Sequence, residues 1–499
     1  MRAARPLIAA GAALFAIASA VAVAVPVPAI PIPQSSSSVA APFIGTPATP
    51  DPLASFAVPQ HPFMAPDGRS NLHNDAYQTD AYNGAGPLGI NPRIRSTFHV
   101  AECASVTFDS AGRIITICVG FDGPRLMMID PDDLSTLAAF PLPPRNPSTL
   151  ANVFSSFSGG GYFYLDHLGR AVIPTNDGRI LVVGVRETAA GPSFMLETVH
   201  DLSGHVSSGD GIVSVLPDWS GLLWFVTESG VVGTAVDSAP LGVRSIDLTG
   251  EAIANSFAVD ETGGVYVVSD HALYRFDAAA DGTPVATWRE PYDRGTRRKP
   301  GQVSQGSGTT PTLIGGGYVA ITDNADPKMN VIVYRRSASV AGSRFVCSAG
   351  VFADGVSNTD QSLIAVGNAL IAENNYGYSG PLATNGGGVT EPGLARVDFD
   401  AGASSCTVVW TSAERAPSVV PKVSLANGLI YTYTKDPQPD STDAWYFTAI
   451  DFRTGATVYK IRAGLGLGFN NNYAPVTLGP DGTAYVGVLG GLAAISDTP

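Results

Sequence analysis

Oxygen-bearing side chains end two neighbouring strand-like segments of the chain. Asp323 and Asn324 follow the run GGGYVAIT, and Glu373 and Asn374 follow the run VGNALIA. Carboxylate and amide oxygens are the ligands that Ca²⁺ and Mg²⁺ prefer in proteins, whereas zinc favours histidine and cysteine. These four residues therefore predict a calcium site. The alternative is that they only form tight turns, because their spacing is not diagnostic in the way that an EF-hand loop is.

Polar residues recur at the equivalent turns of other segments with the same strand pattern. If the segments are arranged in a ring, these turns meet at one face and line a common mouth. The predicted ligand-binding mouth consists of Asp177, Glu228, Asp270, Asn375 and Asp436. The links that lead into the segments add Asp210, Asn255, Gln305, Asn358, Asp360 and Asn470 to Asn472.

Hydrolytic and anion-binding chemistry has less support in the sequence. The seven histidines are scattered, and His73 is typical in having no neighbouring Ser or Asp in a recognisable nucleophile turn. Lys422 and Arg396 could meet an anionic ligand, but single basic residues usually lie at the surface. We therefore expect no catalytic triad.

The four cysteines predict two disulfides. They show no C-x-x-C spacing and have no histidine at ligand spacing, so structural pairing is favoured over metal binding. A hairpin centred on Ser110–Ala111 places Cys103 opposite Cys118. Cys347 and Cys406 then pair by elimination.

The N-terminal region divides by composition into three segments. Residues 1–25 hold two arginines, an apolar run and an A-x-A-like site, which predicts a signal peptide; an uncleaved membrane anchor is the alternative. Residues 26–60 are rich in Pro and Ser and predict an extended spacer. Residues 61–92 are dense in His, Asn, Asp and Tyr and predict a strap across one face of the domain. Its alternating acids and aromatics, a mixture common in carbohydrate or cation contacts, are Asp75, Tyr77, Asp80 and Tyr82.

Residues 93–499 repeat one unit eight times. Each unit has an apolar strand, a glycine turn, a second strand, a polar turn and a third strand, and a fourth strand follows in the better-preserved copies. The spacing is about 53 residues, which predicts an all-β fold, an eight-bladed β-propeller of four-stranded antiparallel blades. Because the last copy has three strands, residues 93–100 are expected to supply its fourth and close the ring. Seven blades with one irregular unit is the alternative. The turn glycines are Gly112, Gly169, Gly221, Gly263, Gly316, Gly367, Gly428 and Gly482.

One repeat carries a motif of a known family. The segment AIDFRTGATVY matches A-x-D-x-x-T-G-x-x-x-W at Ala449, Asp451, Thr454 and Gly455, with Tyr459 in place of the Trp. The chain therefore resembles the quinoprotein-type (PQQ-like) eight-bladed β-propellers, and the resemblance implies that architecture for residues 95–499. The family's dehydrogenases have adjacent cysteines that contact the quinone. These are absent here, so we expect no bound PQQ.

The composition limits the classes of partner. The net charge is −14, which argues against nucleic acid and anionic membranes, since both attract cationic surfaces. No second apolar run of membrane length follows residue 25, so we expect no stable membrane span after signal cleavage. The predicted function is an exported scaffold, secreted or in the cell envelope, that binds a small molecule, glycan or protein. The alternative is a divalent-cation-dependent hydrolase or lyase with its site in the polar mouth, and a quinoprotein oxidoreductase is third.

Overall fold

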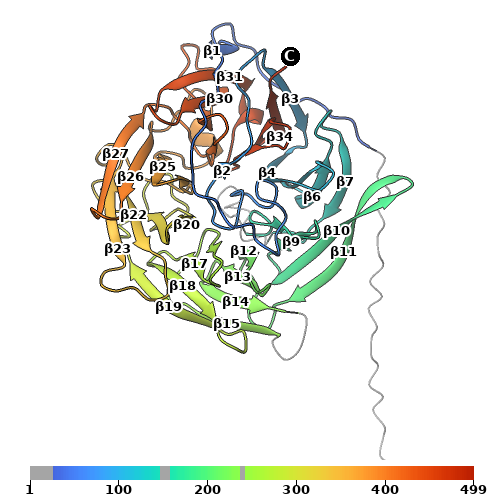
Figure 1. Ribbon diagram of the computed structural model, residues 1–499. Helices are drawn as coiled ribbons and strands as arrows, with labels where there is room; N and C mark the ends of the chain where they lie inside the picture. Colours follow the sequence, from blue (N-terminus) through green and yellow to red (C-terminus); the bar gives the residue numbers. More distant parts are fainter. Residues whose placement is uncertain (1–25, 146–157, 237–241) are drawn as a thin grey trace, which may run out of the picture.

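The chain forms an eight-bladed β-propeller, as the repeats predict. The computed structural model describes residues 26–145, 158–236 and 242–499. The predicted signal peptide, residues 1–25, lies outside this part. Eight sheets surround a central channel, with the first strand of each repeat innermost (Figure 1). Among the described residues, no helix is long and apolar enough to cross a membrane.

The first four blades follow the chain from residue 101 to residue 291, each with its four strands in sequence order across the sheet. Blade 1 comprises β4 (Ala101–Phe108), β5 (Ile114–Gly120), β6 (Gly123–Ile129) and β7 (Thr136–Pro141). Blade 2 comprises β8 (Tyr164–Leu165), β9 (Ala171–Pro174), β10 (Arg179–Thr188) and β11 (Gly191–Asp201). Blade 3 comprises β12 (Ile212–Pro217), β13 (Leu223–Thr227), β14 (Val231–Ala235) and β15 (Val243–Asp247). Blade 4 comprises β16 (Ala258–Val259), β17 (Val265–Val268), β18 (Ala272–Ala278) and β19 (Pro284–Pro291).

The next three blades continue the pattern to residue 465. Blade 5 comprises β20 (Thr312–Ile314), β21 (Tyr318–Thr322), β22 (Asn330–Arg335) and β23 (Phe345–Gly350). Blade 6 comprises β24 (Ile364–Val366), β25 (Ala369–Glu373), β26 (Leu394–Asp400) and β27 (Ser405–Ser412). Blade 7 comprises β28 (Lys422–Ser424), β29 (Leu429–Thr434), β30 (Ala444–Asp451) and β31 (Thr457–Leu465). Short 3₁₀ turns follow β25 and β31, at Pro381–Thr384 (η2) and Leu467–Phe469 (η3).

Blade 8 closes the ring with a strand from the other end of the chain. Its inner strands are β32 (Val476–Leu478), β33 (Ala484–Val488) and β34 (Gly491–Ser496). The outermost strand is β3 (Arg93–Phe98), which pairs antiparallel with β34 so that Arg93 lies opposite Ser496 and Phe98 opposite Gly491. The prediction that residues 93–100 close the ring is confirmed.

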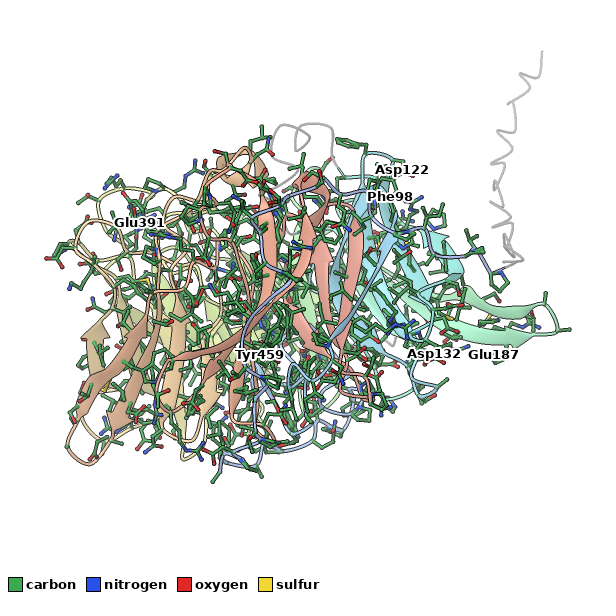
Figure 2. The ribbon with its side chains drawn as sticks, turned by 90° about the horizontal axis from the view of Figure 1, so that it is seen from above. Phe98, Asp122, Asp132, Glu187, Glu391 and Tyr459 are labelled. Atoms are coloured by element: carbon green, nitrogen blue, oxygen red, sulfur yellow. A yellow bond between two sulfur atoms is a disulfide. The ribbon has the colours of Figure 1, made fainter. Side chains whose placement is uncertain are left out.

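The two faces of the disc differ because their turns differ. On one face, which we call the Gly-turn face, inner strands end in tight turns. In blade 1 the Asp109 carboxylate accepts the backbone N–H groups of Ala111 and Arg113, and Gly112 adopts a positive φ of 82°. The opposite face, which we call the open face, carries the turns between second and third strands. Figure 2 shows Phe98, Asp122 and Glu391 near the open face and Asp132 near the Gly-turn face.

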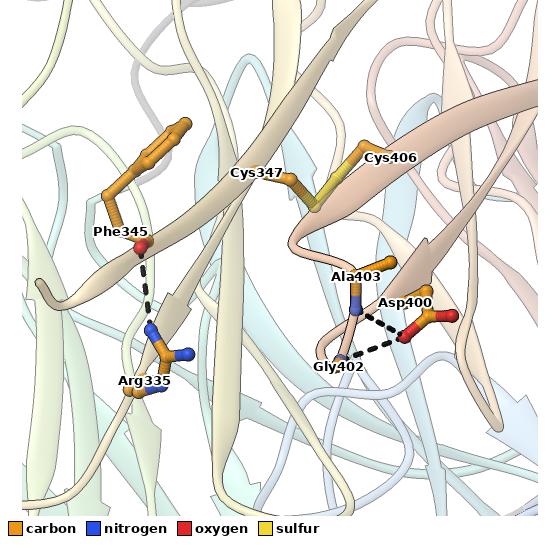
Figure 3. Close-up of a disulfide and its surroundings, with 7 residues drawn as sticks. All are labelled: Arg335, Phe345, Cys347, Asp400, Gly402, Ala403 and Cys406. Atoms are coloured by element: carbon orange, nitrogen blue, oxygen red, sulfur yellow. Dashed lines mark hydrogen bonds between the residues drawn. A yellow bond between two sulfur atoms is a disulfide. The ribbon is translucent and has the colours of Figure 1, made fainter.

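Both predicted disulfides are present. Cys103 and Cys118 lie opposite each other on β4 and β5, as the hairpin register predicts, and are bonded. Cys347 on β23 is bonded to Cys406 on β27, so this second bridge joins the outer strands of blades 5 and 6 (Figure 3). One disulfide therefore links strands within a blade, and the other links two blades.

Residues 26–92 follow the surface of the propeller and then enter its channel. The first part runs past the outer edges, where β1 (Phe43–Gly45) pairs antiparallel with β31. Residues 46–63, the outer course, cross the Gly-turn face, where Leu53 donates to the Leu425 carbonyl and His167 donates to the Phe63 carbonyl. Residues 64–82, the plug, then turn inward and end in β2 (Ala81–Tyr82), which pairs parallel with β28. Figure 1 shows this N-terminal segment in blue over the centre of the ring.

Candidate functional site

The plug closes the central channel at its Gly-turn end. Its backbone forms hydrogen bonds with the inner strands of blades 1, 2, 4, 5, 6 and 7, at distances of 2.7–3.2 Å. These bonds saturate strand edges that would otherwise face the channel. The plug partners of Leu165, Val259, Leu313, Ala365 and Val423 are Ala65, Ala76, Tyr77, Thr79 and Asp80.

Asp80 is the centre of a buried polar cluster at this end. Its carboxylate accepts hydrogen bonds from Lys422 Nζ and Ser362 Oγ, and lies 3.0 Å from Nδ1 of His73. The Lys422 side chain is completely buried, contrary to the expectation that it lies at the surface. Burial alone would raise the pKa of Asp80, but the charges of Lys422 and His73 outweigh it and hold this pKa below its usual value. Burial lowers the pKa of both Lys422 and His73.

The cluster contains the residue types of a hydrolytic triad but not its geometry. Ser362 Oγ lies 3.1 Å from His73 Nδ1, the same nitrogen that Asp80 contacts. In a triad the serine and the carboxylate use different imidazole nitrogens, so that histidine can take a proton from one while the other orients it. This arrangement therefore favours a structural role for Asp80 and its partners.

A small polar cavity lies on the channel axis directly beyond His73. Its volume is about 40 Å³, which is room for a few water molecules. His73 Nε2 is buried and has no hydrogen-bond partner among the described residues. Burial raises the pKa of Asp360 to about 8, although a backbone N–H of Val303 partly offsets this. The lining residues include His73, Tyr162, Asn255, Asp360, Ser362, Asn472 and Tyr473.

A larger, mostly apolar pocket opens between blades 8 and 1 on the open face; we call it the open pocket. Its volume is about 320 Å³. It shares Ala104, Gly161 and Asn472 with the channel cavity, so the two spaces adjoin. Two apolar side chains at its rim are exposed, Val100 by 57% and Phe121 by 88%. The other lining residues include Phe98, Glu102, Ile117, Val119, Arg145, Leu467 and Leu489.

Glu102 is the acidic residue of the open pocket. It lies on β4, and its Oε1 accepts a hydrogen bond of 2.8 Å from the backbone N–H of Asn472. Burial raises the pKa of Glu102 to about 8, while this hydrogen bond and the charge of Arg145 lower it in part. The carboxyl group is therefore mostly protonated at neutral pH and can donate a hydrogen bond inside an apolar pocket.

The four residues of the sequence-based calcium site form hydrogen bonds within their own loops and to neighbouring ones, except that Asn324 Oδ1 is buried without a partner among the described residues. Asp323 accepts from the backbone and side chain of Asn330, and Asn324 donates to backbone carbonyls of the preceding loop. Glu373 accepts from Asn375 and from a threonine of blade 7. Asn374 donates to the Val356 and Pro392 carbonyls. In the described part of the chain no group of three or more His, Cys, Asp or Glu is placed to hold a metal ion. Calcium binding at these residues stays a prediction.

The predicted mouth residues lie at turns of the open face, at different depths. Asp177 and Asp436 are partly exposed and pair with Arg179 and Lys460. Asp270 accepts from Arg294. The other two are nearer the centre: the Glu228 backbone N–H donates to the Gly211 carbonyl at the start of β12, and Asn375 accepts from the Asp360 backbone N–H.

Sequence reasoning missed Glu102 and, although it named Asp80, it missed the contact of Asp80 with Lys422. Glu102 stands in an inner strand between apolar neighbours, and such an interruption is a signal that could have been used. The contact of Asp80 with Lys422 spans 342 positions, and no local pattern reports it. The density of polar residues in 61–92 did point to the segment that supplies Asp80.

Comparisons with known proteins add little beyond the fold. No protein-family profile matches the chain. An uncharacterized protein of Archaeoglobus fulgidus is 28% identical over 319 residues, which are 58% of this chain and 61% of that relative. The chain thus matches less than two thirds of the relative's length.

Several solved structures are similar in shape. BamB from Moraxella catarrhalis aligns with a TM-score of 0.45 and 12% identity, over 83% of this chain and 96% of BamB. Virginiamycin B lyase from Staphylococcus aureus aligns with a TM-score of 0.38 and 10% identity, over 74% of this chain and 99% of the lyase. At these values the similarities carry no statement about function.

Proposed function

We propose that the protein is an exported ligand-binding propeller that takes an apolar small molecule with one polar group in the open pocket. The open pocket itself carries this proposal. Ligand sites are typically concave and mostly apolar, with volumes of about 300–1,000 Å³ and a few well-placed polar groups. The open pocket has a volume of about 320 Å³, apolar walls and a half-buried carboxyl group at Glu102.

The polar groups of the pocket favour a ligand that accepts a hydrogen bond. A protonated Glu102 donates to a carbonyl, ether or hydroxyl oxygen, and the apolar walls bury the rest of the molecule. The adjoining channel cavity, with Asp360 and His73, offers further hydrogen bonds to a group that extends inward. Since Ser362 and Asp80 share one nitrogen of His73, this site is better suited to holding a ligand than to hydrolysing it.

Export is supported by two features. The first 25 residues have the composition of a signal peptide, and all four cysteines form disulfides, which persist in oxidising compartments. We also propose that the protein is a quinoprotein-type propeller. This rests on the motif at Ala449, Asp451, Thr454 and Gly455.

Binding of the neutral apolar dye Nile red tests the proposal. We expect saturable binding to the full chain, and a loss of affinity of more than about tenfold when Ala104→Phe or Val119→Trp fills the pocket. The matched control is Val285→Phe, which adds the same ring at an exposed position of an outer strand. The proposal fails if both pocket variants are folded by circular dichroism and bind the dye as tightly as the parent.

A further inference from the structure

A second cavity lies at the opposite end of the channel, between the outer course and the plug. It has a volume of about 540 Å³ and we call it the strap cavity. One wall is formed by residues 52–58 of the outer course, and the other by the plug. Four oxygen-bearing side chains of the plug line it: Asp67, Asn74, Asp75 and Thr79.

The side-chain oxygen of Asn74 has no partner. Asn74 is only 4% exposed, and its Oδ1 forms no hydrogen bond with any described residue. The amide orientation is fixed because Nδ2 donates to the Ala81 carbonyl and to Asp75. A Cβ atom at Gly68 would lie 3.3 Å from this oxygen, so Oδ1 lies directly beside the Asp67–Gly68 backbone. A buried carbonyl oxygen without a partner is unfavourable and calls for a ligand or an ordered water.

The two carboxyl groups beside Asn74 form no ion pair with a described residue, although the charge of Lys422 acts on Asp75 at longer range. This distinguishes them from Asp80 in the same segment, which pairs with Lys422 and His73. Asp75 is held in place by the backbone N–H and the hydroxyl of Thr79. Burial and the charge of Asp75 raise the pKa of Asp67 to about 8, and burial raises the pKa of Asp75 to about 7. The anionic form of each carboxyl group is thus unfavourable without a cation beside it, and the cavity is large enough to admit a hydrated ion.

We propose that a divalent cation, Ca²⁺ by the chemistry of its ligands, binds in the strap cavity between the carboxylates of Asp67 and Asp75 and Oδ1 of Asn74. Calcium takes six to eight oxygen ligands from carboxylates, amide carbonyls and water in flexible geometry, whereas Mg²⁺ demands a stricter octahedron. Three protein side chains leave positions for water, for which the cavity has room. The ion would join residue 67 to the turn at residues 74–75 and so fasten the plug.

Calorimetric titration of the EDTA-treated full chain with CaCl₂ tests the proposal. We expect one binding event, weakened by more than about tenfold in Asp67→Asn, because a charged ligand is lost. Asp67 is partly exposed and its change is the least disruptive to folding. The matched control is the double variant Asp323→Asn with Glu373→Gln, the carboxylates of the sequence-based calcium site. It should bind as the parent does.

The outcomes separate the two candidate sites. Absence of calcium binding by the parent, or unchanged binding by Asp67→Asn, overturns the proposal. Loss of binding in the control variant alone also overturns it and places the ion at Asp323 and Glu373.

Terbium luminescence gives a second, local readout. The Tyr82 ring lies 3.7 Å from the position of a Cβ at Gly68, close enough to sensitise Tb³⁺ held beside Asn74. Tyr82→Phe should lower the tyrosine-excited emission and leave terbium affinity unchanged. Unchanged emission in this variant, with emission lost in the control variant, contradicts the proposed position.

Discussion

The two ends of the central channel are formed by the same ring of inner strands, yet they are filled in opposite ways. At the Gly-turn end, the plug forms backbone hydrogen bonds with six blades, and the Asp80 charge is matched by Lys422. At the open end, apolar side chains surround Glu102, whose neighbouring charge, Arg145, offsets its burial only in part. The chain itself fills the channel at the Gly-turn end, where the strap cavity lies outside the plug, whereas at the open end the pocket adjoins the channel cavity directly.

The difference shows how the two faces of a propeller built from repeated blades become structurally distinct. Repetition of the blade alone would make every inner strand equivalent. The N-terminal segment breaks this equivalence because it enters from one face only, and within residues 26–145, 158–236 and 242–499 the opposite end of the channel has no such plug. We expect variants at the Gly-turn end to affect mainly stability, and variants at the open end to affect mainly ligand binding.

Truncation should produce the largest difference. Deletion of residues 1–60 keeps the plug and β3, so we expect a soluble protein with one cooperative thermal transition. Deletion of residues 1–102 removes the plug and the closing strand and exposes the edge of β34, which favours aggregation. Light scattering and melting curves of the two proteins check this. Equal solubility and equal transitions would contradict the closure by β3.

Removal of one buried charge should separate the two ends next most strongly. Lys422→Met leaves Asp80 buried without its cation, and breaking a buried pair in this way typically costs about 3–5 kcal/mol. Glu102→Gln at the open end replaces a mostly protonated acid by a neutral isostere, so the free energy of unfolding should change by less than about 1 kcal/mol. Urea denaturation measures both. Equal losses would mean that the ends do not differ as described.

The disulfides should also act at different places. For loops of 15 and 59 residues, chain entropy assigns the Cys103–Cys118 and Cys347–Cys406 bridges about 3 and about 4 kcal/mol of stability. Only the first lies in strands that line the open pocket. Replacement of Cys103 and Cys118 by Ala should therefore weaken Nile red binding, whereas replacement of the other pair should lower stability alone. Identical dye affinities in the two variants would contradict this.

The smallest expected effect is the pH dependence that two acidic groups of the open pocket and the channel cavity contribute. The pKa of Asp360 and that of Glu102 are each about 8 in the folded protein, well above the ordinary values of 3.8 and 4.5. Between those values and pH 8 the folded state binds more protons than the unfolded state, so stability falls as pH rises. From pH 7 to pH 8 each group should contribute a loss of about 1 kcal/mol.

Paired denaturation curves isolate these two groups from others that titrate in the same range. Asp360→Asn and Glu102→Gln should each make the stability profile flatter than that of the parent between pH 7 and pH 8. A profile as steep as the parent's in both variants would show that neither carboxyl group is protonated at neutral pH.

The fold could be predicted because its determinants are local. A glycine turn and alternating apolar residues predict each blade. The Cys103–Cys118 pairing follows from the register of a single hairpin. The closing strand is predictable because the last repeat has only three strands, and residues 93–100 are the strand-like segment that no repeat contains. These inferences need only neighbouring residues and the geometry of antiparallel pairs.

The interior of the channel could not be predicted because its contacts are between distant segments. Asp80 meets Lys422 only after the ring has formed and the plug has entered it, and the hairpin pattern contains no information about that docking. The prominence of Asp and Asn at the turns also drew attention to Asp323 and Glu373, whose loops use those same groups for their own hydrogen bonds.

The pairing of β3 with β34 sets the order in which the protein can be completed during synthesis. Residues 93–98 leave the ribosome long before residues 491–496, and β1 similarly precedes its partner β31. Until the last blade has been made, β3 has no partner strand and the nascent chain is an open arc with an unpaired edge. Such edges are where incomplete β-proteins associate wrongly. The growing chain would therefore depend on chaperones or rapid completion, and its slowest folding step would be the late capture of its earliest residues.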